Sequence, residues 1–253
     1  MKKALAAAAL ALLAALPAQA AENLVSGVSQ DTIQITSNYT GSDIVVFGAI
    51  EGQPDAAQRG EPKDVVVVVR GPDTDIVVRR RDRIGGIWIN HDSASLNGMP
   101  GFYYLASTRP LREIADAPVL ARYDIGVQTL EPDSVHSHHN YEPFRQAAIR
   151  YLERENLYSE VSSGVVWNSD TLFHVHVPVP AAVARGSYNV EVFLLRGGDI
   201  ESAQSTPLFI DQTGLERRLY AYAHDWPLFY GLAAVAFSLL MGWLSSILFR
   251  RPV

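Results

Sequence analysis

The sequence contains no cysteine, which excludes disulfides, thiol nucleophiles, cysteine-ligated zinc and iron–sulfur clusters. Without disulfides the chain must be stabilised by burial alone, for which a domain of about 200 residues is large enough. Lysine is scarce, at three of the 21 basic residues, which we attribute to genomic composition. No HExxH, GxSxG, P-loop or GxGxxG motif is present. We therefore predict that the protein is not an enzyme and holds no cofactor.

Positive charge is also scarce between the two ends of the chain. Residues 22–249 hold 17 basic and 27 acidic residues, a charge of about −10, because two lysines and two arginines lie in the terminal segments. Bulk electrostatics then disfavour binding to nucleic acid or to anionic lipid. We predict no nucleic-acid partner.

Residues 1–20 have the organisation of a secretory signal peptide. Lys2 and Lys3 form a positive start, and Ala4 to Leu16 is an apolar run too short to span a membrane comfortably. Ala18-Gln19-Ala20 then matches a small-x-small cleavage site. The alternative is an uncleaved anchor.

A second apolar segment, residues 227–249, contains no charge and is long enough to cross a membrane as a helix. Pro227 suits the first helical turn. Arg250 and Arg251 follow directly, and positive flanks remain cytoplasmic. We therefore predict a single-pass protein of the bacterial inner membrane, with its N-terminal domain in the periplasm.

Small residues recur every four positions along this predicted helix, so they share one face. Such a ridge lets a second helix approach closely, in a homodimer or in a transporter. The alternative is that small residues are common in membrane helices. The ridge consists of Ala234, Ser238, Gly242 and Ser246.

Between the terminal segments, short β-branched runs separated by Gly, Pro and Asp turns predict an antiparallel sandwich. The Val65–Val69 run predicts a strand buried on both faces. Gly186-Ser187-Tyr188 leads into alternating valines, as in an immunoglobulin-like sandwich where a tyrosine pins the corner. One soluble helix is predicted at about 143–155, where apolar residues follow a helical period.

The predicted fold class is thus mainly β: one or two periplasmic immunoglobulin-like sandwiches with one soluble helix, and a single C-terminal transmembrane helix. The predicted segments are a signal peptide at 1–20, a β-sandwich-like region at 21–118, an irregular segment and helix at 119–160, a second, immunoglobulin-like β region at 161–212, a juxtamembrane helix at 213–226, the transmembrane helix at 227–249 and a cytoplasmic tail at 250–253.

Histidines are the candidate metal ligands. His174 and His176 lie two apart on a predicted strand, so both imidazoles project from one face. His136, His138 and His139 cluster in a predicted loop. Together they could bind copper or zinc. The alternative is that they only decorate a solvated surface.

Four arginines, Arg79, Arg80, Arg81 and Arg83, form a basic patch in the acidic domain. Guanidinium groups can contact an oxyanion in a bidentate manner. The alternative is a solvated hairpin turn in which Asp82 and nearby acids are the partners, and we favour it.

Several motifs together resemble the uncharacterised alphaproteobacterial putative transmembrane protein family. The resemblance covers nearly all of the chain after the signal peptide, and implies an inner-membrane protein with no assigned activity. Members are often encoded beside sulfite-exporter-like permeases, which implies a transport partner. The motifs are YTG at 39–41, DVVVVVRGP at 64–72, GIWIN at 86–90, LASTRPL at 105–111 and TGLERRLYAYAHDWPLFYGL at 213–232.

Three hypotheses for function follow. The leading one is a non-enzymatic accessory or interaction protein, in contact with the lipid bilayer and with another transmembrane helix. The second is a periplasmic metal-binding protein, and the third is a hydrolase without a recognisable motif.

Overall fold

The computed structural model describes residues 23–35, 39–52, 60, 62–137, 140–212 and 222–248. The predicted signal peptide, the cytoplasmic tail, His138 and His139 lie outside these residues, as does most of the predicted juxtamembrane helix.

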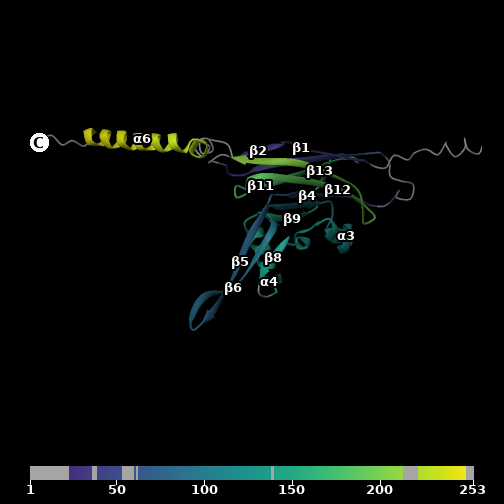
Figure 1. Cartoon of the computed structure of the whole chain (residues 1–253). Coiled ribbons are helices and arrows are strands. Elements are labelled where there is room, and N and C mark those ends of the chain that lie inside the picture. Colours follow the sequence, from purple (N-terminus) through teal and green to yellow (C-terminus); the bar gives the residue numbers. More distant parts are fainter. Residues whose placement is uncertain are drawn as a thin grey trace, which may run out of the picture.

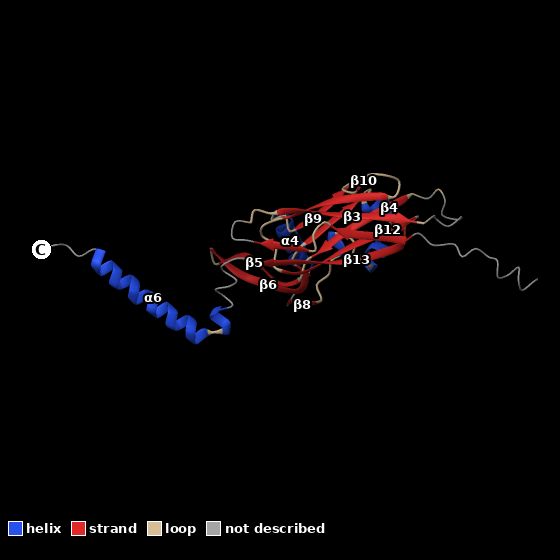
Figure 2. Cartoon of the chain, turned by 90° about the horizontal axis from the view of Figure 1, so that it is seen from above, coloured by secondary structure: helices blue, strands red, loops and turns tan. Residues whose placement is uncertain are grey.

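The fold is mainly β, and its strands form three sheets (Figures 1 and 2). Sheet A has the order β1-β3-β11-β10, sheet B the order β2-β13-β12-β4-β7-β9, and sheet C the order β5-β6-β8. The bounds are β1 Asn23–Val28, β2 Thr32–Ile35, β3 Ser42–Glu51, β4 Lys63–Arg70, β5 Asp73–Ile84, β6 Ile87–Pro100, β7 Tyr103–Ser107, β8 Ser134–Ser137, β9 Tyr158–Ser162, β10 Val166–Trp167, β11 Leu172–Val179, β12 Gly186–Arg196 and β13 Asp199–Gln212.

Sheet B lies in the middle and is buried on both faces. Val65, Val67 and Val69 of β4 point into a core shared with sheet A, whereas Val66 and Val68 point into a second core under sheet C and the helices. Alternate residues of a strand face opposite sides, so a strand between two cores is apolar throughout. The prediction that this valine run is buried on both faces is confirmed.

The first core is a sandwich of sheets A and B. Gly48 of β3 is required there because a Cβ atom at this position would lie on the ring of Phe173, its cross-strand partner. On the other side of the sandwich, Tyr188 Oη donates a 2.5 Å hydrogen bond to the carbonyl of Ala184. This is the tyrosine contact that the sequence pattern predicts at the start of β12.

Both predicted β regions contribute strands to both sheets of this sandwich. Sheet A combines β1 and β3 with β10 and β11, and sheet B combines β4 and β7 with β12 and β13. Most pairs are antiparallel, as predicted, but β2 with β13 and β7 with β9 are parallel. Non-local pairings of this kind leave no pattern in the sequence.

The helices cover the second core. The predicted soluble helix is confirmed as α4 (Glu142–Arg154), with a proline in its first turn. The segment before it also contains two short helices, α2 (Leu111–Ile114) and α3 (Ala117–Arg122), and a 3₁₀ turn, η1 (Val127–Thr129). The helix α6 (Pro227–Leu248) begins at the predicted proline, and its stretch Pro227–Ile247 is long and apolar enough to cross a membrane.

The β5–β6 hairpin is much longer than the two short strands that the sequence suggests. Its base packs on the second core, and its distal half projects away from the rest of the sheets (Figure 1). The third strand, β8, pairs only with Ala94–Asn97 of β6, so the distal half is a two-stranded ribbon. Gly85 and Gly86 both have positive φ angles and form its two-residue turn.

Candidate functional site

The distal half of the β5–β6 hairpin carries all four predicted anion-contact arginines. Arg79, Arg80, Arg81 and Arg83 are exposed, and they lie on the strand β5 rather than in a turn. Their alternation along the strand divides them between the two faces of the ribbon.

One face holds Arg79, Arg81 and Arg83, which we call the arginine face. Arg79 and Arg81 make no hydrogen bond or ion pair to any described residue, and Arg83 Nε donates only to the carbonyl of Gly86, at 3.3 Å. Trp88 lies directly across the strands from Arg83. Its side chain is 68% exposed, so the arginine face ends in an exposed aromatic ring.

The opposite face holds Arg80, which is paired. Its Nε lies 3.3 Å from Asp82 Oδ2 and its Nη2 lies 3.6 Å from Asp92 Oδ2. The prediction that Asp82 pairs with these arginines therefore holds for Arg80, and for no other of the four among the described residues. A bulge between Arg80 and Arg81 lies within this ion-paired group, because Asp82 is on its distal side.

The end of the ribbon is apolar. Ile84 and Ile87 pair across the glycine turn and are 46% and 66% exposed, and Ile89 follows on the same face. We call Ile84, Ile87 and Ile89 the apolar tip. Large apolar side chains that project from a body into solvent are typical of an interaction site when they cluster.

The predicted histidine ligands are not brought together as one group. His174 and His176 lie on the outer face of sheet A, with ring centroids 5.4 Å apart, and the residues between and beside them are buried. His174 Nδ1 is 2.5 Å from Asn168 Oδ1. His136 lies on β8 of sheet C, which packs on the other side of sheet B.

Among the described residues, no group of three or more His, Asp or Glu side chains is arranged to hold a metal ion. The pair on β11 supplies two imidazoles, and a stable site for zinc or copper needs more ligands. His138 and His139 lie outside the described residues.

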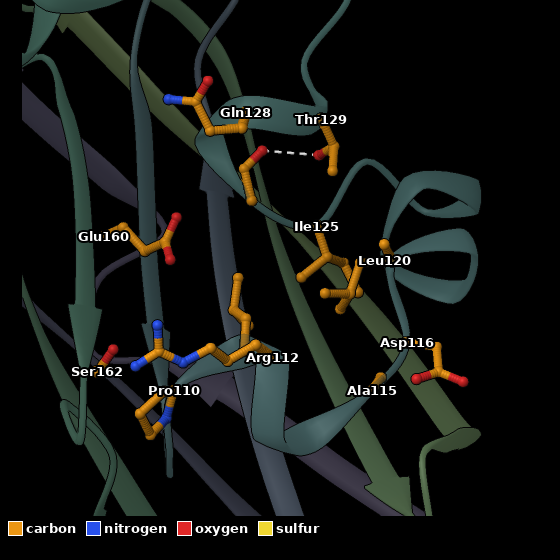
Figure 3. Close-up of a pocket in the computed structure, with 13 residues that line it drawn as sticks. Pro110, Arg112, Ala115, Asp116, Leu120, Ile125, Gln128, Thr129, Glu160 and Ser162 are labelled. Carbon is orange, nitrogen blue, oxygen red and sulfur yellow. Dashed lines mark hydrogen bonds between the residues drawn. The ribbon is translucent and has the colours of Figure 1, made fainter.

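Sequence reasoning missed a cavity of about 520 Å³ between α2, α3, η1 and β9 (Figure 3). Leu111, Leu120 and Ile125 form its apolar wall, and Arg112 and Glu160 lie on its polar side. Four separate elements line it, and three of them (α2, α3 and η1) are short elements of the segment before α4, so no local signal in the sequence could have revealed it.

The small-residue ridge is present on α6. Ser238 Oγ donates to the carbonyl of Ala234 at 2.8 Å, which satisfies the hydroxyl inside its own helix. A Cβ atom at Gly242 would meet no other atom of the described chain. The described chain therefore makes no contact at this position of the ridge.

Among the described residues, one apolar helix is long enough to span a membrane and accompanies the β-sheets, which is the organisation of a single-pass membrane protein. The chain belongs to the family described as "Putative transmembrane protein (Alph_Pro_TM)", whose model matches residues 23–251. No curated protein matches the chain. The family resemblance seen in the sequence is thereby confirmed.

Proposed function

We propose that this protein is a non-enzymatic interaction protein of the bacterial inner membrane, with its β body in the periplasm and the β5–β6 hairpin as its docking element. The observation that carries the proposal is the apolar tip, displayed on a ribbon that nothing in the described chain covers. A two-stranded ribbon is marginally stable in water, so a partner that covers it would also stabilise it.

We also propose that the body is immunoglobulin-like, which would favour an interaction role because such sandwiches commonly present loops and hairpins to partners. The hydrogen bond from Tyr188 to the carbonyl of Ala184, at the start of β12, supports the immunoglobulin-like assignment. The orientation is supported by the two arginines after the apolar helix and by the signal-like start of the chain.

Site-specific thiol labelling tests both docking and orientation. The chain has no cysteine, so Ile87→Cys and the control Arg150→Cys, on the exposed side of α4, each create a unique thiol. A membrane-impermeant maleimide applied to spheroplasts should label Arg150→Cys rapidly and Ile87→Cys slowly. After purification in detergent the two rates should become similar.

Equal labelling rates in native membranes would remove the docking role of the hairpin. Labelling of neither variant before lysis would reverse the proposed orientation. The two failures are distinct, because the control reports orientation alone.

A second contact is proposed within the membrane, where the ridge of α6 packs against another helix in a homodimer or a transporter. Gly242→Ile and Ser238→Ile widen the ridge without adding charge, so insertion should persist. We expect co-purification of membrane partners in mild detergent to fall severalfold, with Leu239→Ile as the control. Unchanged co-purification in both variants would leave α6 as a plain anchor.

A further inference from the structure

The arginine face is an array of guanidinium groups with few partners among the described residues: only Arg83 makes a hydrogen bond, to the carbonyl of Gly86. Arg79, Arg81 and Arg83 are two residues apart, so neighbouring groups emerge about 6.6 Å apart along the strand. The described chain leaves Arg79 and Arg81 unpaired, although acids pair with Arg80 on the opposite face. Charge complementarity therefore favours an external anionic partner that can contact several guanidinium groups at once.

The apolar tip and Trp88 favour a partner that has an apolar region next to its anionic groups. A site for free phosphate or for nucleic acid would not require exposed isoleucines at the end of the ribbon. Tryptophan prefers the membrane–water interface, and arginine binds lipid phosphates. Transfer of an isoleucine side chain from water to the acyl region is favourable in free energy. Toward its end the distal ribbon presents Arg79 and Arg81 first, then Arg83 across from Trp88, and finally Ile84 across from Ile87. The apolar tip lies on the face opposite the arginine face, and the two faces meet at the end of the ribbon.

The bilayer is also the surface to which α6 would tether the β body. Strand β13 ends at Gln212 and α6 begins at Pro227, so at most about 50 Å of extended chain separates the sheets from the membrane. A tether of this length keeps the hairpin at a high effective concentration near the lipid headgroups, so even weak binding to them is populated. The unsupported ribbon beyond Arg79 adds a reach of about 17 Å.

The charge of the whole protein opposes this contact, since the formal net charge is −6. Residues 79–91 are a local exception, with four arginines and a single aspartate. The acidic body would then be repelled from an anionic surface while the hairpin is attracted, which orients the body with this ribbon toward the lipid.

We propose that the β5–β6 hairpin docks on the headgroups of anionic phospholipids, with Arg79, Arg81 and Arg83 on the phosphates and the apolar tip at the acyl boundary. This inference rests on the proposed role of the hairpin as a docking element. It goes further by naming the partner as a lipid surface.

The test uses the full chain with Ile87→Cys carrying an environment-sensitive fluorophore, reconstituted in nanodiscs of phosphatidylcholine with or without phosphatidylglycerol. With phosphatidylglycerol present, a quencher attached to the lipid acyl chains should quench the label severalfold more than in neutral discs, and high salt should reverse the difference. Arg79→Gln/Arg81→Gln should abolish the quenching. The control Arg80→Gln/Arg150→Gln removes the same charge outside the arginine face and should retain it.

Three other outcomes would overturn the inference. If the label is shielded in native membranes but never quenched by lipid, the partner is a protein and the docking role stands. If the label is open to a water-soluble quencher in native membranes and in both kinds of disc, the docking role fails as well. If lipid quenching is equal in the two discs and unchanged by the double substitution, the tip inserts without any contact from the arginine face.

Discussion

Two arginines of the β body, Arg109 and Arg145, differ from those of the arginine face in what they bind. Arg145 on α4 is 6% exposed. Its Nε and Nη2 donate to Glu142 at 2.9 and 2.8 Å, and its Nη1 donates to the carbonyls of Gln128 and Leu130 at 3.1 and 2.9 Å. It therefore ties the irregular segment around η1 to the helix.

Arg109 has a similar role beside β4, where its Nε and Nη2 donate to the buried Asp64 at 2.9 and 2.5 Å. In the hairpin, by contrast, Arg79 and Arg81 hold nothing in the described chain. Arg109 and Arg145 therefore hold irregular segments of the chain against neighbouring elements. Arg79 and Arg81 make no such contact in the described chain, which supports the role proposed for the arginine face toward an external partner.

The largest expected effect tests the body side of this comparison. Arg145→Ala removes the donors of two backbone carbonyls and of Glu142, so the free energy of unfolding should fall by about 3 kcal/mol. The measurement is urea unfolding of the full chain in detergent, followed by circular dichroism. Arg150→Ala, one exposed arginine on the same helix, is the control and should change little. A similar loss in both variants would show that the buried contacts of Arg145 are not responsible.

A smaller, pH-dependent effect is expected at Asp64. Burial raises the pKa of this carboxyl group, but hydrogen bonds from Arg109 and Thr108 outweigh it and hold the pKa below the ordinary value of 3.8. A lowered pKa in the folded state means that the ionised form stabilises the fold above the unfolded pKa. This contribution disappears as the pH falls through the folded pKa.

Asp64→Asn should therefore lower the free energy of unfolding by about 1.5 kcal/mol at neutral pH. The gap to the unsubstituted protein should close in strong acid, below the folded pKa. Urea midpoints measured from neutral to acidic pH give the comparison. A gap that stays constant with pH would assign the loss to packing instead of charge.

Much of the body could be predicted because its signals are local. The valine run of β4, the alternation of β11, the tyrosine at the start of β12 and the uncharged stretch of α6 each depend on neighbouring residues only. A strand that is buried on one face has alternating apolar residues, and a strand buried on both faces has a continuous apolar run, so burial can be recognised from the sequence.

The hairpin and the cavity could not be predicted for the opposite reason. The distal part of β5 has no buried face, so its arginines read as a turn although they continue the strand for several residues. The cavity depends on four elements brought together by the sheets. Sequence spacing likewise could not show that His136 and the pair on β11 lie on different sheets.

The smallest expected effect tests the hairpin side of the comparison. Arg79→Gln and Arg81→Gln remove side chains that contact no described partner, so each should change the free energy of unfolding by less than about 0.5 kcal/mol. Arg80→Gln also loses an exposed ion pair with Asp82, worth a similarly small amount, and an ion pair with Asp92, whose side chain is only 8% exposed, so its effect should be the largest of the three. Urea unfolding of the full chain in detergent, where no anionic lipid is present, gives all three values. If Arg79→Gln or Arg81→Gln destabilised the protein as strongly as Arg145→Ala, these arginines would be structural residues of the ribbon. The distinction between arginines that hold the chain together and arginines kept for an external partner would then be wrong.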